Sequence, residues 1–183
     1  MTNKILSCLS VAAVLFFLTL TGCSKKSSNP VDPTNSVTSA SVSGSVTLNG
    51  GDYSNTVMNY AFGAGGYSTN DQSTACVMYA TSGTDSLYIV VSFAGSSTGN
   101  YQWQGFTEDS LNYYIDGVGI SVYKSNGSYS YLLPQSGGNT NITKYGAVGE
   151  TIEGSFSGTL QDPLGSTTVT VSGSFKVVRA PDN

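Results

Sequence analysis

Apolar and polar side chains alternate with a period of two along most of the chain from residue 42 onward. The alternation is clearest in residues 151–160 and again in residues 167–178. In the first of these segments, one face carries Ile152, Phe156 and Leu160, whereas the other carries only Ser, Thr and Glu side chains. Because successive side chains of a β-strand point to opposite sides, this pattern predicts amphipathic strands. We find no helical stripe of useful length, so the sequence predicts an all-β fold.

Gly, Asn, Asp and Ser break the alternation at short intervals and divide the chain into about ten candidate strands. We expect these strands at residues 42–48, 56–62, 74–81, 85–93, 100–106, 110–116, 118–124, 128–133, 140–145, 151–160 and 167–178. The turns at 82–85 and 125–128 would join neighbouring strands as hairpins. Since an amphipathic sheet must bury its apolar face, we predict a single antiparallel β-sandwich, with a lipocalin-like closed barrel as the alternative.

The first 22 residues have the order of an export signal. Lys4 supplies a positive charge, residues 5–20 form an apolar run, and the sequence Leu-Thr-Gly-Cys ends at Cys23. The run is shorter than the about 20 apolar residues of a typical transmembrane helix. Leu-Thr-Gly-Cys resembles the lipobox of bacterial lipoproteins, in which the signal peptide is removed and the cysteine receives acyl chains such as palmitate. The resemblance implies a signal peptide at 1–22, lipid attachment at Cys23, and a location in the cell envelope. Because Ser24 rather than an acidic residue follows, it favours the cell outer membrane.

Residues 23–40 consist mainly of Ser, Asn, Thr and Pro, with little that could be buried. Such a segment gains too little from burial to offset its conformational entropy, so we expect a disordered tether there. The all-β domain is then expected at residues 41–180. Its size is sufficient for one core without disulfides.

A second resemblance concerns the end of the chain. The segments Glu-Gly-Ser-Phe-Ser-Gly at 153–158 and Gly-Ser-Phe-Lys-Val at 173–177 resemble a signature of small uncharacterised lipoproteins from Bacteroidota and related phyla. The resemblance covers residues 141–160 and 169–179. It implies an all-β envelope protein and carries over no activity and no site residue.

The residues needed for common catalytic sites are scarce. The sequence contains no histidine, and Cys76 is the only cysteine in the expected domain. Histidine is the commonest general base and metal ligand, so we predict no enzyme activity, no cofactor and no metal site. Calcium bound by oxygen ligands of a loop, such as Asn70 and Asp71 or Asp116, stays open. A carboxylate-based hydrolase stays open as a less favoured alternative, because acidic pairs can hydrolyse glycosides. Its candidates are Glu108, Asp109, Asp116, Glu150 and Glu153, but their spacing selects no pair.

Aromatic residues are concentrated between residues 101 and 131. Tyr101 and Trp103 form one i, i+2 pair and Tyr129 and Tyr131 form another, so each pair would share a strand face. Rings in such a strip can stack on the CH faces of sugars, which makes these four residues a candidate ligand face. The alternative is that they fill the core, which is a more frequent role for Tyr and Trp in strands.

These observations favour a non-catalytic binding or adhesive module that is held on a membrane by a lipid, with a glycan or an envelope protein as partner. A structural or assembly role in an envelope complex, through pairing at sheet edges, is the alternative. A third possibility is a barrel that carries a lipid. The net charge of −4 and the absence of a basic cluster in the domain argue against nucleic-acid binding.

Overall fold

The computed structural model describes residues 41–82, 85–108 and 113–183, and in this part the chain is all-β, as predicted. The strands are β1 (Ser43–Gly50), β2 (Tyr53–Ser68), β3 (Ser73–Ser82), β4 (Asp85–Ala94), β5 (Gly99–Gln102), β6 (Gly105–Glu108), β7 (Tyr113–Tyr123), β8 (Tyr129–Pro134), β9 (Asn139–Tyr145), β10 (Thr151–Gln161) and β11 (Thr168–Arg179). The predicted signal peptide, Cys23, the tether at 23–40 and Asp109 lie outside the described residues. No helix in the described part is long and apolar enough to cross a membrane.

Eight strands close into an antiparallel barrel in the order β1, β2, β3, β4, β7, β8, β10 and β11. The pairing therefore agrees with the barrel alternative that the sequence left open. Closure between β8 and β10 depends on two residue pairs, Leu160 with Pro134 and Gln161 with Leu133. Along the rest of the same edge, β10 pairs instead with β9, which in turn pairs with β5.

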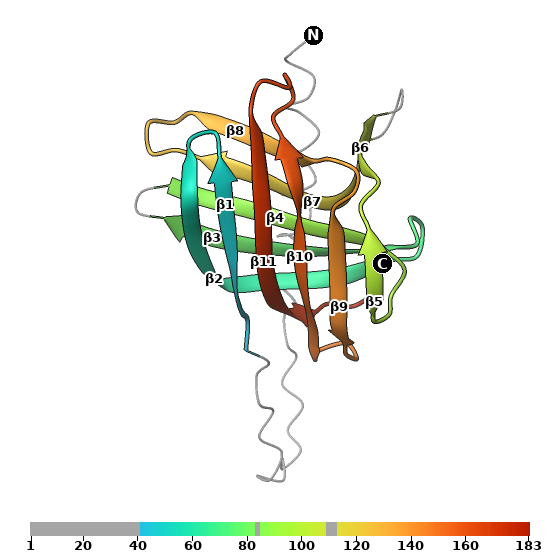
Figure 1. Cartoon of the computed structure of the whole chain (residues 1–183). Helices are drawn as coiled ribbons and strands as arrows, with labels where there is room; N and C mark the ends of the chain where they lie inside the picture. The colour runs from blue at the N-terminus through green and yellow to red at the C-terminus, as the bar shows by residue number, and fades with distance from the viewer. Residues whose placement is uncertain (1–40, 83–84, 109–112) are drawn as a thin grey trace. The chain divides into compact units, whose positions relative to one another are not determined.

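The barrel is flattened into two layers whose strands cross (Figure 1). One layer contains β1, β11, β10, β9 and β5, and the other contains β3, β4, β7 and β8. β2 belongs to both, since its first half pairs with β1 and its second half with β3. The inward side chains form one hydrophobic core, with Trp103, Phe93, Leu48, Met78, Leu87 and Ile89 among the largest that are fully buried.

The hairpin of β10 and β11 forms with the faces that the alternation predicted. Ile152, Phe156 and Leu160 of β10 are buried, as are Val169 and Val177 of β11. The intervening Ser and Thr side chains point outward and extend a polar surface over β1, β11, β10 and β9. The strict period of two was sufficient to predict these faces because one side of the hairpin is buried and the other is solvated.

Three strand boundaries differ from the prediction. The strand expected at 100–106 is split into β5 and β6, because the chain passes from one layer to the other at Trp103 and Gln104. The strands expected at 110–116 and 118–124 are joined, at least from Tyr113, into β7, which continues through Gly117 at a φ of 129°. β2 continues past Phe62 to Ser68, since its glycines allow close contact with β3 rather than ending the strand.

Candidate functional site

Trp103, which the sequence placed on a candidate ligand face, belongs to the core. The residue is only 2% exposed, so its ring cannot offer a surface to a ligand. Its indole Nε1–H donates a hydrogen bond of 2.8 Å to Oγ1 of Thr140, which is also buried. The ligand-face prediction is wrong for Trp103, and the alternative prediction of core packing holds.

Three glycines from three different strands or loops make room for this ring. A methyl group built at Gly138 would lie 2.1 Å from the Trp103 ring, one at Gly158 would lie 2.2 Å from it, and one at Gly117 would lie 2.7 Å from it. All three distances are shorter than any normal carbon contact. Trp103 therefore fills the space between the layers at the point where the chain crosses between them.

Tyr101 also lies apart from Tyr129 and Tyr131. Its ring packs 4.8 Å from the ring of Phe93, and its hydroxyl donates a 2.8 Å hydrogen bond to the main-chain oxygen of Ser97. It is half-buried against the core. Of the four predicted face residues, only Tyr129 and Tyr131 lie together on the outer surface, with ring centroids 5.5 Å apart.

Tyr131 belongs to a row of side chains that crosses five strands on the outside of the barrel. Phe62 of β2 pairs with Tyr79 of β3, Tyr79 with Tyr88 of β4, Tyr88 with Ser121 of β7, and Ser121 with Tyr131 of β8. We call this set the ring row. Phe62 is 61% exposed and Tyr79 is 44% exposed. Ser121 is only 7% exposed, so its neighbours leave no gap at that position.

A second row runs parallel to the ring row, two residues further along each strand. It consists of Thr81, Ser86, Tyr123 and Tyr129, which are also paired in register, and we call it the hydroxyl row. Every member carries a hydroxyl group. Tyr123 and Tyr129 are 50% and 45% exposed.

On the other side of the ring row lie Ala64, Val77, Val90 and Gly119, again in register, which we call the aliphatic row. The three rows together form the aromatic face. None of its members carries a charge at neutral pH. Burial raises the pKa of Tyr88 and of Tyr131, with nearby tyrosines as smaller causes, so these hydroxyls stay protonated.

One ring of the aromatic face has its orientation fixed by a hydrogen bond. The hydroxyl of Tyr79 donates to Oγ of Ser86 at 2.8 Å, from the ring row to the hydroxyl row. Because Ser86 is the acceptor, its own hydroxyl hydrogen is available for another partner. The bond holds the Tyr79 ring across the neighbouring strand.

Sequence reasoning missed Phe62, Tyr79, Tyr88 and Tyr123 as members of this surface. One signal could have found the central pair. The hairpin that the sequence predicts at 82–85 would pair Ser82 with Asp85 and so place Tyr79 opposite Tyr88, which is the register observed. No comparable local signal connects Phe62 to Tyr79, because a register shift between Tyr60 and Phe62 intervenes.

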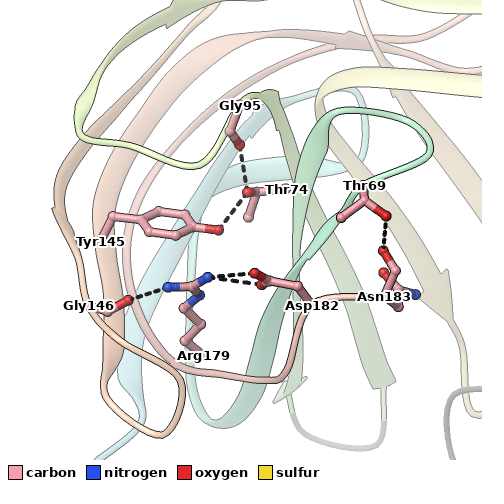
Figure 2. A network of polar contacts seen from close by, with 8 residues as sticks. All are labelled: Thr69, Thr74, Gly95, Tyr145, Gly146, Arg179, Asp182 and Asn183. Atoms are coloured by element: carbon pink, nitrogen blue, oxygen red, sulfur yellow. Dashed lines mark hydrogen bonds and ion pairs between the residues drawn. The ribbon is translucent and has the colours of Figure 1, made fainter.

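A polar network surrounds the end of β11 (Figure 2). The Arg179 guanidinium donates to the Gly146 oxygen and to both carboxylate oxygens of Asp182, each at 2.9 Å, and lies 4.8 Å from the centre of the Tyr145 ring. The Tyr145 hydroxyl contacts Oγ1 of Thr74 at 2.9 Å. Among the described residues the buried Nε–H of Arg179 has no hydrogen-bond partner, but the other polar groups of this network satisfy one another, as in a structural contact.

Two of the acidic side chains proposed for a hydrolase, Glu150 and Glu153, have local structural roles. Glu150 accepts a hydrogen bond from the Ala147 N–H at 2.9 Å, and Glu153 forms ion pairs with Lys176 and Lys144 at 3.5 and 3.9 Å. Burial is the main cause that raises the pKa of Asp116, although a hydrogen bond from the Gln104 backbone opposes it. The described residues contain no group of three or more His, Cys, Asp or Glu side chains that could hold a metal ion.

Comparison with other proteins gives no match: no family model, curated protein or solved structure matches the chain. The aromatic face is therefore interpreted from its own chemistry.

Proposed function

We propose that this chain is a non-catalytic binding protein of the bacterial cell envelope, and that its aromatic face binds a glycan. The observation that carries the proposal is the ring row, in which four aromatic rings from four strands are aligned on the outer surface. Rings that stay in water are not needed for the core, which is already filled by other side chains. A contiguous exposed patch of this kind is characteristic of an interaction surface.

The chemistry of the face favours a neutral glycan. A sugar ring has an apolar CH face, which stacks on an aromatic ring, and hydroxyl groups at its edge, which need hydrogen-bond partners. The ring row offers the first kind of contact and the hydroxyl row offers the second. The absence of charged members gives no counter-charge for an anionic ligand.

The attachment to a membrane is proposed from Leu-Thr-Gly-Cys at 20–23 alone. Cleavage before Cys23 and acylation would leave the binding domain on a lipid anchor, and two or more acyl chains hold a protein stably where one is marginal. The expected location is the outer membrane. Cys23→Ser should move the protein out of the membrane fraction and remove the lipid mass from the intact protein. An unchanged mass and fractionation would contradict lipidation, without bearing on the aromatic face.

A structural role in an envelope assembly is the second candidate, and one observation favours it. β5 pairs with β9 along one edge, and no other described strand pairs with its second edge at Gly99–Gln102. An open edge can accept a strand from a partner. Crosslinking in the native envelope tests this candidate: recovery of the protein without any crosslinked partner would count against it.

Binding to a panel of neutral polysaccharides tests the proposed function. The full-length protein in detergent is run in affinity gels that contain each polysaccharide, beside the variants Phe62→Ala, Tyr123→Ala and Tyr114→Ala. Tyr114 is the matched control, since it is 48% exposed and lies outside the three rows. We expect retardation by at least one polysaccharide, loss of at least tenfold in affinity in the first two variants, and no loss in the control. Absence of retardation throughout, or equal binding by all variants, would overturn the proposal.

A further inference from the structure

The strand register shows that the aromatic face is elongated across the strands. Each row runs perpendicular to the strands, from β2 or β3 on one side to β7 or β8 on the other. The side chains in a row are separated by one inter-strand spacing, whereas the rows are separated by two residues along a strand. The face is therefore a band across the sheet rather than an isolated ring.

The ring row is long compared with a single sugar. From Phe62 on β2 to Tyr131 on β8 there are four inter-strand steps. At about 4.8 Å a step, the row extends over about 19 Å. A single sugar ring could contact only one or two of the aromatic side chains at a time, whereas several linked sugars could contact all of them.

The flanking rows give this band two different sides. The hydroxyl row lies along one side of the rings, from β3 to β8, and the aliphatic row lies along the other, from β2 to β7. A ligand that uses the whole band therefore needs a continuous apolar face with hydroxyl groups along one edge. A linear chain of sugars that lies along the ring row presents an apolar CH face to the rings and hydroxyl groups to the hydroxyl row at every unit.

We infer that the aromatic face binds a linear, uncharged polysaccharide along its length, with the chain crossing β2, β3, β4, β7 and β8 over Phe62, Tyr79, Tyr88 and Tyr131. This inference rests on the proposed glycan-binding function and specifies its ligand as the interior of a polymer rather than a free sugar or a chain end. Ser86 positions the Tyr79 ring, the second member of the row, through the 2.8 Å hydrogen bond. A ring that is held in place before binding loses less entropy when the ligand arrives.

Titration calorimetry with oligosaccharides of graded length tests the inference. The full-length protein in detergent is titrated with the linear gluco-, manno- and xylo-oligosaccharides of one to six units that correspond to the polysaccharide bound in the gel. We expect affinity to rise at least tenfold between the disaccharide and the longest oligomer, and then to reach a plateau once the row is covered. Phe62→Ala and Tyr131→Ala remove opposite ends of the row, so each should weaken the hexamer several-fold and shorten the length at which the plateau begins.

Two controls keep the outcomes separate. Tyr114→Ala should bind every oligomer as the unchanged protein does, and Tyr79→Phe, which loses the bond to Ser86 but keeps the ring, should weaken binding less than Tyr79→Ala. Thermal unfolding of each variant identifies any that fails to fold, and Phe62→Ser is the substitute at that position, because the side chain is 61% exposed. Equal affinity for one sugar and for six would overturn the extended-chain inference while the proposed function stands. Loss of binding to every glycan would overturn both.

Discussion

The indole N–H of Trp103 donates a 2.8 Å hydrogen bond to Oγ1 of Thr140, and neither residue is accessible to solvent by more than 2%. The bond joins the crossover between β5 and β6 to the inward side of β9. A buried N–H without an acceptor has a large desolvation cost, so Thr140 is needed wherever this tryptophan is buried.

Thr140→Val should therefore lower the free energy of unfolding by about 1–3 kcal/mol, since the methyl group keeps the shape but leaves the indole N–H unsatisfied. Denaturant unfolding monitored by Trp fluorescence measures the change. Thr168→Val is the control, because Thr168 is exposed on β11, and it should stay within about 0.5 kcal/mol. A loss of the same size in both variants would contradict a specific role for the hydrogen bond.

Gly158→Ala should destabilise the barrel because the new methyl group would lie 2.2 Å from the Trp103 ring. Overpacking of this kind costs typically about 1–3 kcal/mol, and a rigid indole has little room to move. Gly66→Ala is the control, since its nearest contact would be an ordinary 3.5 Å.

The reason for that cost can be isolated with a double variant. If contact with Trp103 causes the loss of stability, Gly158→Ala should lower the free energy of unfolding by less in a Trp103→Leu background, where the smaller side chain leaves space for the new methyl group. Additive losses in chemical denaturation would indicate that the glycine is needed for a different reason.

Parts of the fold that depend on a pattern within a short stretch of sequence could be predicted, and parts that depend on pairing between distant residues could not. The hairpin of β10 and β11 could be predicted because a strict alternation places Ile152, Phe156 and Val177 on one buried side. The closure of the barrel could not, because it depends on pairs such as Leu160 with Pro134, which no local pattern specifies.

The same distinction applies to the candidate site. Tyr129 and Tyr131 share an exposed strand face, as their i, i+2 spacing predicted. The equal spacing of Tyr101 and Trp103 predicted a shared face as well, but the chain changes layers at Trp103 and turns its ring inward. The members of the ring row come from five strands, and only the full register brings them into line.

Removal of residues 181–183 should loosen the second half of β2. The N–H of Thr69 donates to the main-chain oxygen of Asn183 at 2.8 Å, and the N–H of Asn183 donates to Tyr67 at 3.1 Å. Asp182 is also lost as the partner of Arg179. With each net hydrogen bond contributing about 0.5–1.5 kcal/mol, we expect a loss of about 2 kcal/mol.

Hydrogen exchange locates this effect. The Thr69 amide should exchange much faster in the shortened protein, while core amides such as that of Ile89 should change only by the global loss of stability. Pro181→Ala is the control, because Pro181 is exposed and the residues that follow it are kept. Unchanged protection at Thr69 would contradict the role assigned to the C-terminal contacts.

Glu153 should make a small contribution to stability that disappears in acid. The Thr151 hydroxyl, which donates to it at 2.7 Å, is the main cause that lowers the pKa of this carboxyl, and Lys176 and Lys144 add to the effect. Because the pKa is lower in the folded state, the stabilisation is fully present above the ordinary pKa of about 4.3. It is lost as the pH falls through the folded-state value. The carboxyl and both lysines are partly exposed, so the contribution is below about 1 kcal/mol.

Denaturant unfolding between pH 7 and about pH 3 measures this difference for the unchanged protein and Glu153→Gln. The two free energies should differ most near neutral pH and converge as the pH falls through the folded-state pKa, where the carboxyl is protonated and becomes similar to the amide. Thr151→Val separates the causes, since it removes the main one and should raise the carboxyl pKa measured by NMR, whereas added salt should weaken only the two ion pairs. A difference that stays constant from neutral to acid pH would mean that the glutamine acts through packing, and that the Glu153 charge contributes nothing to folding.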